Sequence, residues 1–179
     1  MPAKRLLDRD RATLLVVDVQ EGFRPVIHRF EHMAGQVATL VQGAEAVGVP
    51  VLVTEQYPQG LGHTVPEVSE HLDVTPIAKV CFAATDAEGF DLRGRDQVLI
   101  CGIEAHICVS QTAHALLEQG VEVHVAADAC SSRTKEDRTT GLLKMTSAGA
   151  IPSSVETALF ELLGAAGGAE FKTIQALVK

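Results

Sequence analysis

The chain has 179 residues, of which 46% are hydrophobic, and its 15 basic and 23 acidic residues give a formal net charge of -8. A chain of this length and composition can bury one sizeable core, so we expect a single globular domain over residues 1–179. The acidic balance, without a stripe of Lys or Arg that could neutralise phosphates, argues against nucleic acid as a partner.

The N-terminal sequence MPAKRLLDRDR is charged and lacks the apolar core of a signal peptide. No apolar run approaches the roughly 20 residues that span a bilayer, so we expect a cytoplasmic protein without a membrane partner. The four cysteines form neither a CxxC pair nor the dense pattern of a disulfide-rich secreted domain. We expect free thiols at Cys81, Cys101, Cys108 and Cys130.

Six short apolar runs predict β-strands. Several of them are continuous rather than alternating, which is typical of parallel strands covered on both faces. In chain order they are Thr13–Val19, Val51–Thr54, Ile77–Val80, Gln97–Cys101, Val121–Ala126 and Ala150–Pro152.

Apolar residues three and four positions apart predict helices over Met33–Val47, His106–Gln119 and Glu136–Ala148. The segment Glu55–Pro66 has two glycines and two prolines and is expected to be a loop. A last amphipathic stretch, Glu170–Val178, follows a run rich in glycine. Strands that alternate with helices in this way predict an α/β fold built from repeated βαβ units.

Two reactive side chains lie near the carboxyl ends of predicted strands. Asp18 comes directly after the apolar run Leu14–Val17, and Cys108 lies in GIEAHICV, shortly after the strand Gln97–Cys101. Ligands of an open parallel sheet bind at the carboxyl ends of its strands, so both side chains are expected at one edge. A turn or capping role for Asp18 is the alternative.

Cys108 is a candidate nucleophile. If the helix begins near His106, the thiol lies in its first turn, where free N–H groups and the helix dipole favour a thiolate. An ordinary thiol, with a pKa of about 8.5, also needs a neighbouring base or cation, which Asp18 and Lys79 can supply. The alternatives are a buried core cysteine at 108 and an exposed strand lysine at 79.

The combination of LLVVDVQEGF, a mid-chain lysine and GIEAHICVSQTA resembles the isochorismatase-like cysteine hydrolases, in order and spacing, from about Ala12 to about Phe160. The resemblance implies a Rossmann-like, three-layer αβα sandwich around a parallel sheet of about six strands. It also implies a catalytic triad of Asp18, Lys79 and Cys108, without a cofactor.

The same resemblance implies a cis peptide bond between Ile103 and Glu104, and an oxyanion hole formed by the backbone N–H groups of Glu104 and Cys108. The expected reaction is cleavage of the C–N bond of a small amide through a thioester. An ether hydrolase of the isochorismatase type, whose members generally lack the cysteine, is one alternative. A non-catalytic binding or scaffold protein is another, since fold does not fix function.

Nicotinamidases of this family carry an Asp-x-His pair and a further His that bind a zinc-like ion. Here Glu55 and Tyr57 stand at the first two positions, and only His63 matches the third. A lone His with a Glu is a poor site for a divalent metal that takes three protein ligands, so no metal is expected. The TEQYPQGLG loop resembles a subgroup of the family whose substrates are mostly unassigned.

Three further side chains are expected to line a substrate pocket. Phe23 and Tyr57 lie on the loops after the first two strands, and His106 precedes Cys108 by two residues. Covering the core, or exposure to solvent, is the alternative for each. The resemblance also implies a homo-oligomer, a dimer or larger, and the apolar stretch Ile174–Val178 is suited to covering a neighbour.

Overall fold

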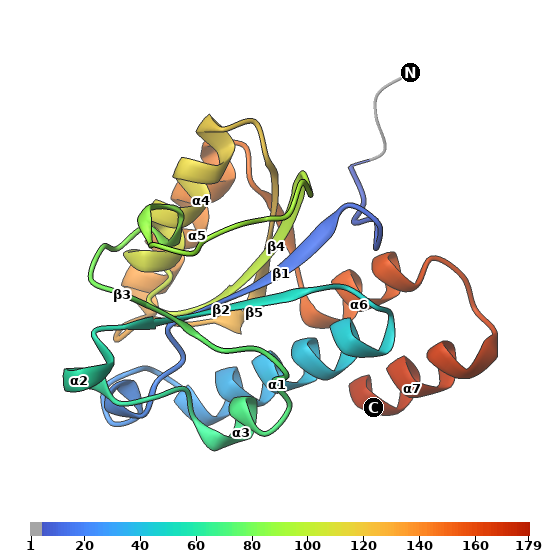
Figure 1. The fold of residues 1–179 in the computed structure, drawn as a ribbon, viewed down its shortest axis with the longest axis horizontal. Helices are drawn as coiled ribbons and strands as arrows, with labels where there is room; N and C mark the ends of the chain where they lie inside the picture. Colours follow the sequence, from blue (N-terminus) through green and yellow to red (C-terminus); the bar gives the residue numbers. More distant parts are fainter. Residues whose placement is uncertain (1–4) are drawn as a thin grey trace.

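A six-stranded parallel sheet lies at the centre of the protein, shown here as a computed structural model that describes residues 5–179 (Figure 1). Its strands are β1 (Ala12–Val17), β2 (Val51–Gln56), β3 (Ile77–Lys79), β4 (Gln97–Gly102), β5 (Glu122–Cys130) and β6 (Ile151–Ser153). They lie in the order β3-β2-β1-β4-β5-β6, and all neighbours pair in parallel. The predicted α/β class is confirmed.

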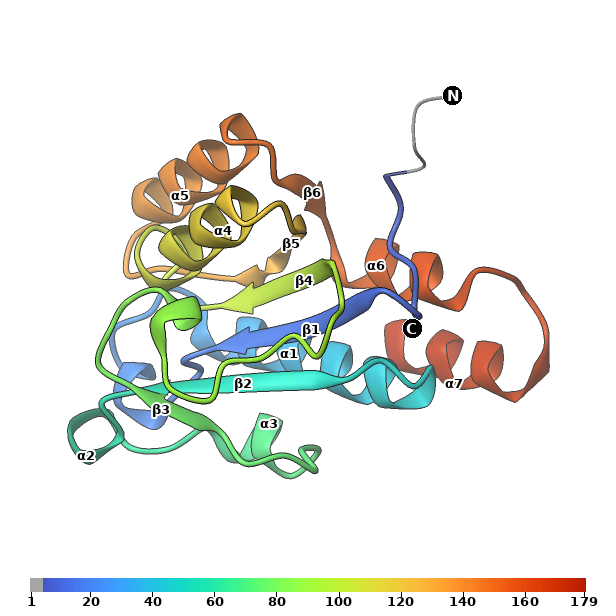
Figure 2. The ribbon, with the colours of Figure 1, turned by 45° about the horizontal axis from the view of Figure 1, so that its top comes forward.

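Helices cover both faces of this sheet, which completes the three layers (Figure 2). One face carries α1 (Phe30–Ala46), α6 (Val155–Leu163) and α7 (Gly168–Val178), and the other carries α4 (Cys108–Glu118) and α5 (Lys135–Ser147). The shorter elements are α2 (Pro58–Leu61), α3 (Pro66–Ser69) and the 3-10 turns η1 (Glu21–Phe23) and η2 (Ala84–Asp86). Within residues 5–179 we find no helix with the length and apolar character needed to cross a membrane.

The central strands β1 and β4 are buried along their whole length, because helices cover continuous apolar runs on both sides. The strand order reverses between these two strands, since β1 leads to β2 on one side and has β4 on the other. Such a reversal opens a crevice at the carboxyl ends of the strands, where α/β proteins bind ligands. Asp18 follows β1 at this point, and the segment that leads from β4 to Cys108 begins there.

Gly102, the last residue of β4, permits the close approach of β1. It has φ 112°, and a side chain there would collide with the backbone of Val17. Only glycine combines this backbone conformation with the absence of a Cβ atom. The turn out of β4 can therefore pass directly over the end of β1.

The prediction that Glu55–Pro66 forms a loop is wrong in part. Strand β2 continues to Gln56, and Pro58–Leu61 form the short helix α2. Both Pro58 and Pro66 lie in the first turn of a helix, where the missing N–H of proline costs nothing. Strand β5 also runs four residues beyond its predicted end, and α6 was not predicted.

Candidate active site

Asp18 is held at the end of β1 by the neighbouring strand. The residue has φ 55°, in the left-handed region that residues with a Cβ atom seldom adopt, and it is fully buried. Its N–H donates to the carbonyl of Thr54 at 3.1 Å, and its Oδ1 accepts a hydrogen bond of 2.7 Å from the Thr54 hydroxyl. Strand β2 therefore fixes both the backbone and one oxygen of this carboxylate.

Lys79 ends β3 and pairs with the other oxygen of Asp18. Its Nζ lies 2.8 Å from Asp18 Oδ2, and the two side chains are 0% and 1% exposed. A buried ion pair persists only where further hydrogen bonds satisfy its remaining atoms. Nζ also donates to Gln56 Oε1 at 2.6 Å and to the carbonyls of Cys81 and Phe82 at 3.2 and 3.3 Å.

Cys108 is the first residue of α4 and is 6% exposed. Burial raises the pKa of its thiol to about 12, the charge of Asp18 adds to the increase, and Lys79 opposes it. The raised pKa runs against the expectation that the first turn of the helix favours a thiolate, and burial is its largest cause. The resting group is a neutral thiol within reach of a carboxylate and an ammonium.

The segment between β4 and α4 is shaped around its own backbone N–H groups. The peptide bond between Ile103 and Glu104 is cis. Within the described part of the chain, no hydrogen-bond acceptor pairs with the N–H of Glu104 or of Cys108. The hydrogen-bonding capacity of these two N–H groups is therefore unused within residues 5–179.

The residues that follow β5 support this segment from behind. Ser131 accepts a hydrogen bond of 2.8 Å from the N–H of Ala105. The N–H and Nε of Arg133 both donate to Glu104 Oε2 at 3.1 Å. The carboxylate of Glu104 therefore ties this segment to Arg133.

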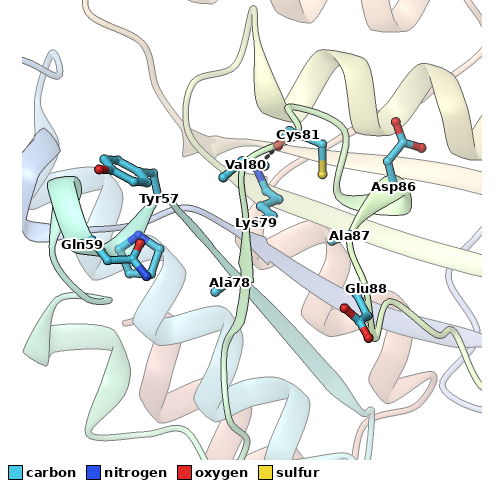
Figure 3. Close-up of a pocket in the computed structure, with 10 residues that line it drawn as sticks. Tyr57, Gln59, Ala78, Lys79, Val80, Cys81, Asp86, Ala87 and Glu88 are labelled. Carbon is cyan, nitrogen blue, oxygen red and sulfur yellow. Dashed lines mark hydrogen bonds between the residues drawn. The ribbon is translucent and has the colours of Figure 1, made fainter.

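The three predicted pocket residues lie in different surroundings. Tyr57 is 54% exposed and lines a cavity of about 300 Å³ together with Lys79 and Cys81 (Figure 3). Phe23 packs against the hydrophobic core, and His106 Nδ1 lies 3.0 Å from Ser132 Oγ. Of the three, the structure brings only Tyr57 to this cavity, whose opposite side carries Asp86 and Glu88.

Glu55 and His63 form a contact of their own, with His63 Nδ1 3.0 Å from Glu55 Oε2. Burial acts to raise the pKa of Glu55, but hydrogen bonds from Thr64 and His63 outweigh it and leave that pKa below its ordinary value. Three or more potential metal ligands do not gather anywhere in residues 5–179. The His63 side chain is 82% exposed.

Asp18, Lys79 and Cys108 thus bring a carboxylate, an ammonium and a thiol into one buried cluster, and groups of these kinds can take part in covalent catalysis. Two partners of the cluster were not predicted from the sequence, Thr54 and Gln56. Both lie in β2. The contact of Thr54 with Asp18 follows from the pairing of Val17 with Thr54 across β1 and β2, and that of Gln56 with Lys79 follows from their pairing across β2 and β3.

Comparisons with known proteins identify the family and the fold of the chain. The Isochorismatase domain model matches residues 12–157. The chain is 44% identical over 169 residues to isochorismatase domain-containing protein 2 of Pongo abelii, covering 93% of this chain and 82% of that protein.

Two solved structures are similar throughout. A structure described as the MAR1 ribonuclease of Caenorhabditis elegans is 38% identical, covers 97% of this chain and 92% of its own, and has a TM-score of 0.90. The YcaC gene product of Escherichia coli, described as an octameric hydrolase of unknown specificity, is 26% identical, with 92% and 85% coverage and a TM-score of 0.85.

Proposed function

The chain belongs to the isochorismatase family, and from this premise we propose that it is a cysteine-dependent hydrolase that cleaves the C–N bond of a small amide. The observation that carries the proposal is the buried contact between Lys79 Nζ and Asp18 Oδ2 beside the thiol of Cys108. A thiol whose pKa is raised to about 12 needs a base at the moment of attack, and Asp18 is the adjacent carboxylate.

In the first half of the reaction, Asp18 accepts the Cys108 proton as the sulfur forms a bond to the carbonyl carbon of the amide. The negative charge moves to the carbonyl oxygen, which the N–H groups of Glu104 and Cys108 stabilise. A single donor of this kind is worth about 3 to 4 kcal/mol in serine hydrolases. The C–N bond then breaks, and the amine leaves with the proton held by Asp18.

The second half releases the acid. Asp18 takes a proton from a water molecule, whose oxygen attacks the thioester carbon. The C–S bond breaks, the acid departs, and the sulfur recovers its proton from Asp18. Lys79 remains paired with Asp18 throughout, and no metal or cofactor enters this scheme.

The partner in this proposal is a small molecule. The cavity of about 300 Å³ beside Lys79 has room for a small molecule, but its lining includes neither Asp18 nor Cys108, so it adjoins the catalytic cluster rather than containing it. The C. elegans relative is described as a ribonuclease, but a net charge of -8 opposes the approach of a polyanion to this chain. A homo-oligomer, a dimer or larger, is also part of the proposal, and the octameric E. coli structure supports it.

The test is a comparison of the wild type, Cys108→Ala and Cys81→Ala on a panel of small primary amides, with release of ammonia as the readout. Cys81→Ala is the matched control, because Cys81 is the partly exposed cysteine of the adjoining cavity. We expect ammonia from the wild type and from Cys81→Ala, and none above background from Cys108→Ala.

Two further substrates separate the alternatives. Turnover of a vinyl ether that survives Cys108→Ala would support an ether hydrolase instead. Cleavage of labelled RNA would support, for this chain, the ribonuclease activity by which the C. elegans relative is described. If the wild type turns over none of these compounds, a binding or scaffold role takes the place of the amidase.

A further inference from the structure

The side-chain amide of Gln56 lies at the end of β2, directly opposite Lys79 in the register of β2 and β3. Its Oε1 accepts a hydrogen bond of 2.6 Å from Lys79 Nζ, and its Nε2 donates one of 2.9 Å to the carbonyl of Val80. A carbonyl oxygen accepts hydrogen bonds and donates none, so the amide nitrogen must face Val80. The amide oxygen is therefore the atom that faces the ammonium.

A second, buried amide holds the backbone of Gln56 in place. Gln20 is fully buried, and its Oε1 accepts a hydrogen bond of 2.7 Å from the Gln56 N–H. Its Nε2 donates to the carbonyls of Gln56 and Gly62 at 3.0 and 2.7 Å. This arrangement fixes the end of β2 from which the Gln56 side chain reaches Lys79.

Lys79 Nζ has four oxygen partners in the described chain. They are Asp18 Oδ2, Gln56 Oε1 and the carbonyls of Cys81 and Phe82. An uncharged amine would direct a lone pair at one of these oxygens, whereas an ammonium offers each of its three N–H groups to an acceptor. The surroundings thus hold Lys79 as a cation, and Asp18 is the one charged acceptor among the four.

We propose that Gln56 is a positioning residue of the catalytic centre, whose neutral amide holds the Lys79 ammonium against Asp18 without adding a second carboxylate. A carboxylate at position 56 would share the ammonium with Asp18 and add negative charge beside the thiol. Both effects oppose the formation of a thiolate at Cys108. The catalytic consequence rests on the proposed function, whereas the effect on the thiol does not.

Gln56→Glu tests this directly, because Glu has nearly the shape of Gln and adds one charge. Gln59→Glu is the matched control, since it adds the same charge to an exposed residue of α2 that lines the adjoining cavity. The readout is the rate at which iodoacetamide alkylates Cys108 at pH 8, followed by mass spectrometry in a Cys81→Ala background. An increase of one unit in the thiol pKa corresponds to an alkylation rate about tenfold lower.

We expect Gln56→Glu to be alkylated at least about tenfold more slowly than the wild type, Gln56→Ala to lie between them, and Gln59→Glu to match the wild type. Equal rates for the wild type and Gln56→Glu, or for Gln56→Ala and Gln56→Glu, would overturn the proposal. If Gln56→Glu does not unfold cooperatively on heating, Gln56→Ala decides alone, and a rate equal to that of the wild type overturns it.

Alkylation needs no substrate, so the two proposals fail separately. A wild type that hydrolyses no amide, combined with slow alkylation of Gln56→Glu, would remove the amidase and keep the role of Gln56. Amide hydrolysis by the wild type, combined with equal alkylation rates for the wild type and Gln56→Glu, would keep the amidase and remove the role of Gln56. On a substrate that is turned over, Gln56→Ala should lower kcat and leave KM unchanged.

Discussion

Gly141 of α5 lies against the backbone of Ala105, three residues before Cys108. A Cβ atom at position 141 would come within 2.5 Å of the Ala105 carbonyl oxygen and 2.7 Å of His106 Cα. Helix α5 therefore packs directly on the segment that supplies the free N–H groups of Glu104 and Cys108. A helix on the outer layer thereby helps to set the geometry of the site.

Gly141→Ala should displace that segment. We expect a loss of about 1 to 3 kcal/mol in the free energy of unfolding, measured in urea, because an added methyl group in a packed contact forces the backbone to shift. Gly35→Ala in α1 is the control, since nothing lies within 4 Å of a Cβ atom there. The free energy of unfolding of Gly35→Ala should be about 0.5 to 1 kcal/mol higher than that of the wild type, because alanine favours a helix more than glycine does. A neutral effect of Gly141→Ala would contradict the close packing.

The pH dependence of Cys108 alkylation follows from its buried thiol. With a pKa of about 12, the thiolate fraction should rise about tenfold per pH unit at pH values well below 12. The alkylation rate in a Cys81→Ala background is expected to increase from pH 7 to pH 10 without levelling. A plateau below pH 9 would mean that the thiolate is already formed in the resting site.

Asp18→Asn should destabilise the protein strongly. It leaves the buried ammonium of Lys79 without a counter-charge, and the loss of one partner of a buried ion pair costs about 3 to 5 kcal/mol. The double variant Asp18→Asn, Lys79→Met should recover much of this loss in urea unfolding, yet show no turnover. Equal stability of the single variant and the wild type would show that the pair is not buried in solution.

Arg24 joins three carboxylates of separate segments, with hydrogen bonds to Glu21, Glu31 and Glu67. These bonds hold the pKa values of Glu21 and Glu67 below their ordinary value. A carboxyl group whose pKa is lowered by folding contributes stability above its unfolded pKa, and that contribution is lost as the pH falls through the folded pKa. The cluster should therefore stabilise the protein at neutral pH and cease to do so in acid.

Arg24→Ala consequently should lower Tm more at pH 7 than at pH 3, measured by thermal unfolding. The change is expected to be modest, since partly exposed ion pairs are screened by solvent. Lys172→Ala, which removes an exposed charge from α7, is the control and should change Tm little at either pH. If Arg24→Ala lowers Tm as much at pH 3 as at pH 7, the loss arises from packing and not from the charges of the cluster.

The strands could be predicted within a few residues because parallel strands in a covered sheet are continuous apolar runs. Strand β5 was cut short because its last part includes the polar Asp128, which accepts a hydrogen bond from Val155. Helix α6 was not predicted, although the sequence carries a capping residue for it. The Ser154 side chain caps the first turn by accepting a hydrogen bond from the Thr157 N–H.

The residues of the candidate site were likewise predicted only in part from the sequence. Asp18 and Cys108 were found because reactive side chains at strand ends meet at one edge of a parallel sheet. Gln20, Gln56 and Gly141 could not be found by that argument. The contact of Gln56 depends on the register of β2 with β3, those of Gln20 depend on how the segment after β1 meets the end of β2, and that of Gly141 depends on how closely α5 packs. None of these is encoded in a local pattern.

Lys79 belongs to β3, a strand of three residues at the outer edge of the sheet, and its partner Asp18 follows β1, two strands inward. Short edge strands open locally at a smaller free-energy cost than central ones. Every opening of β3 would withdraw the ammonium from the thiol and leave the chain otherwise folded. Hydrogen exchange at the amides of β3 should therefore be faster than at those of β1 and β4, and it would report the state of the Lys79–Asp18 pair well before global unfolding.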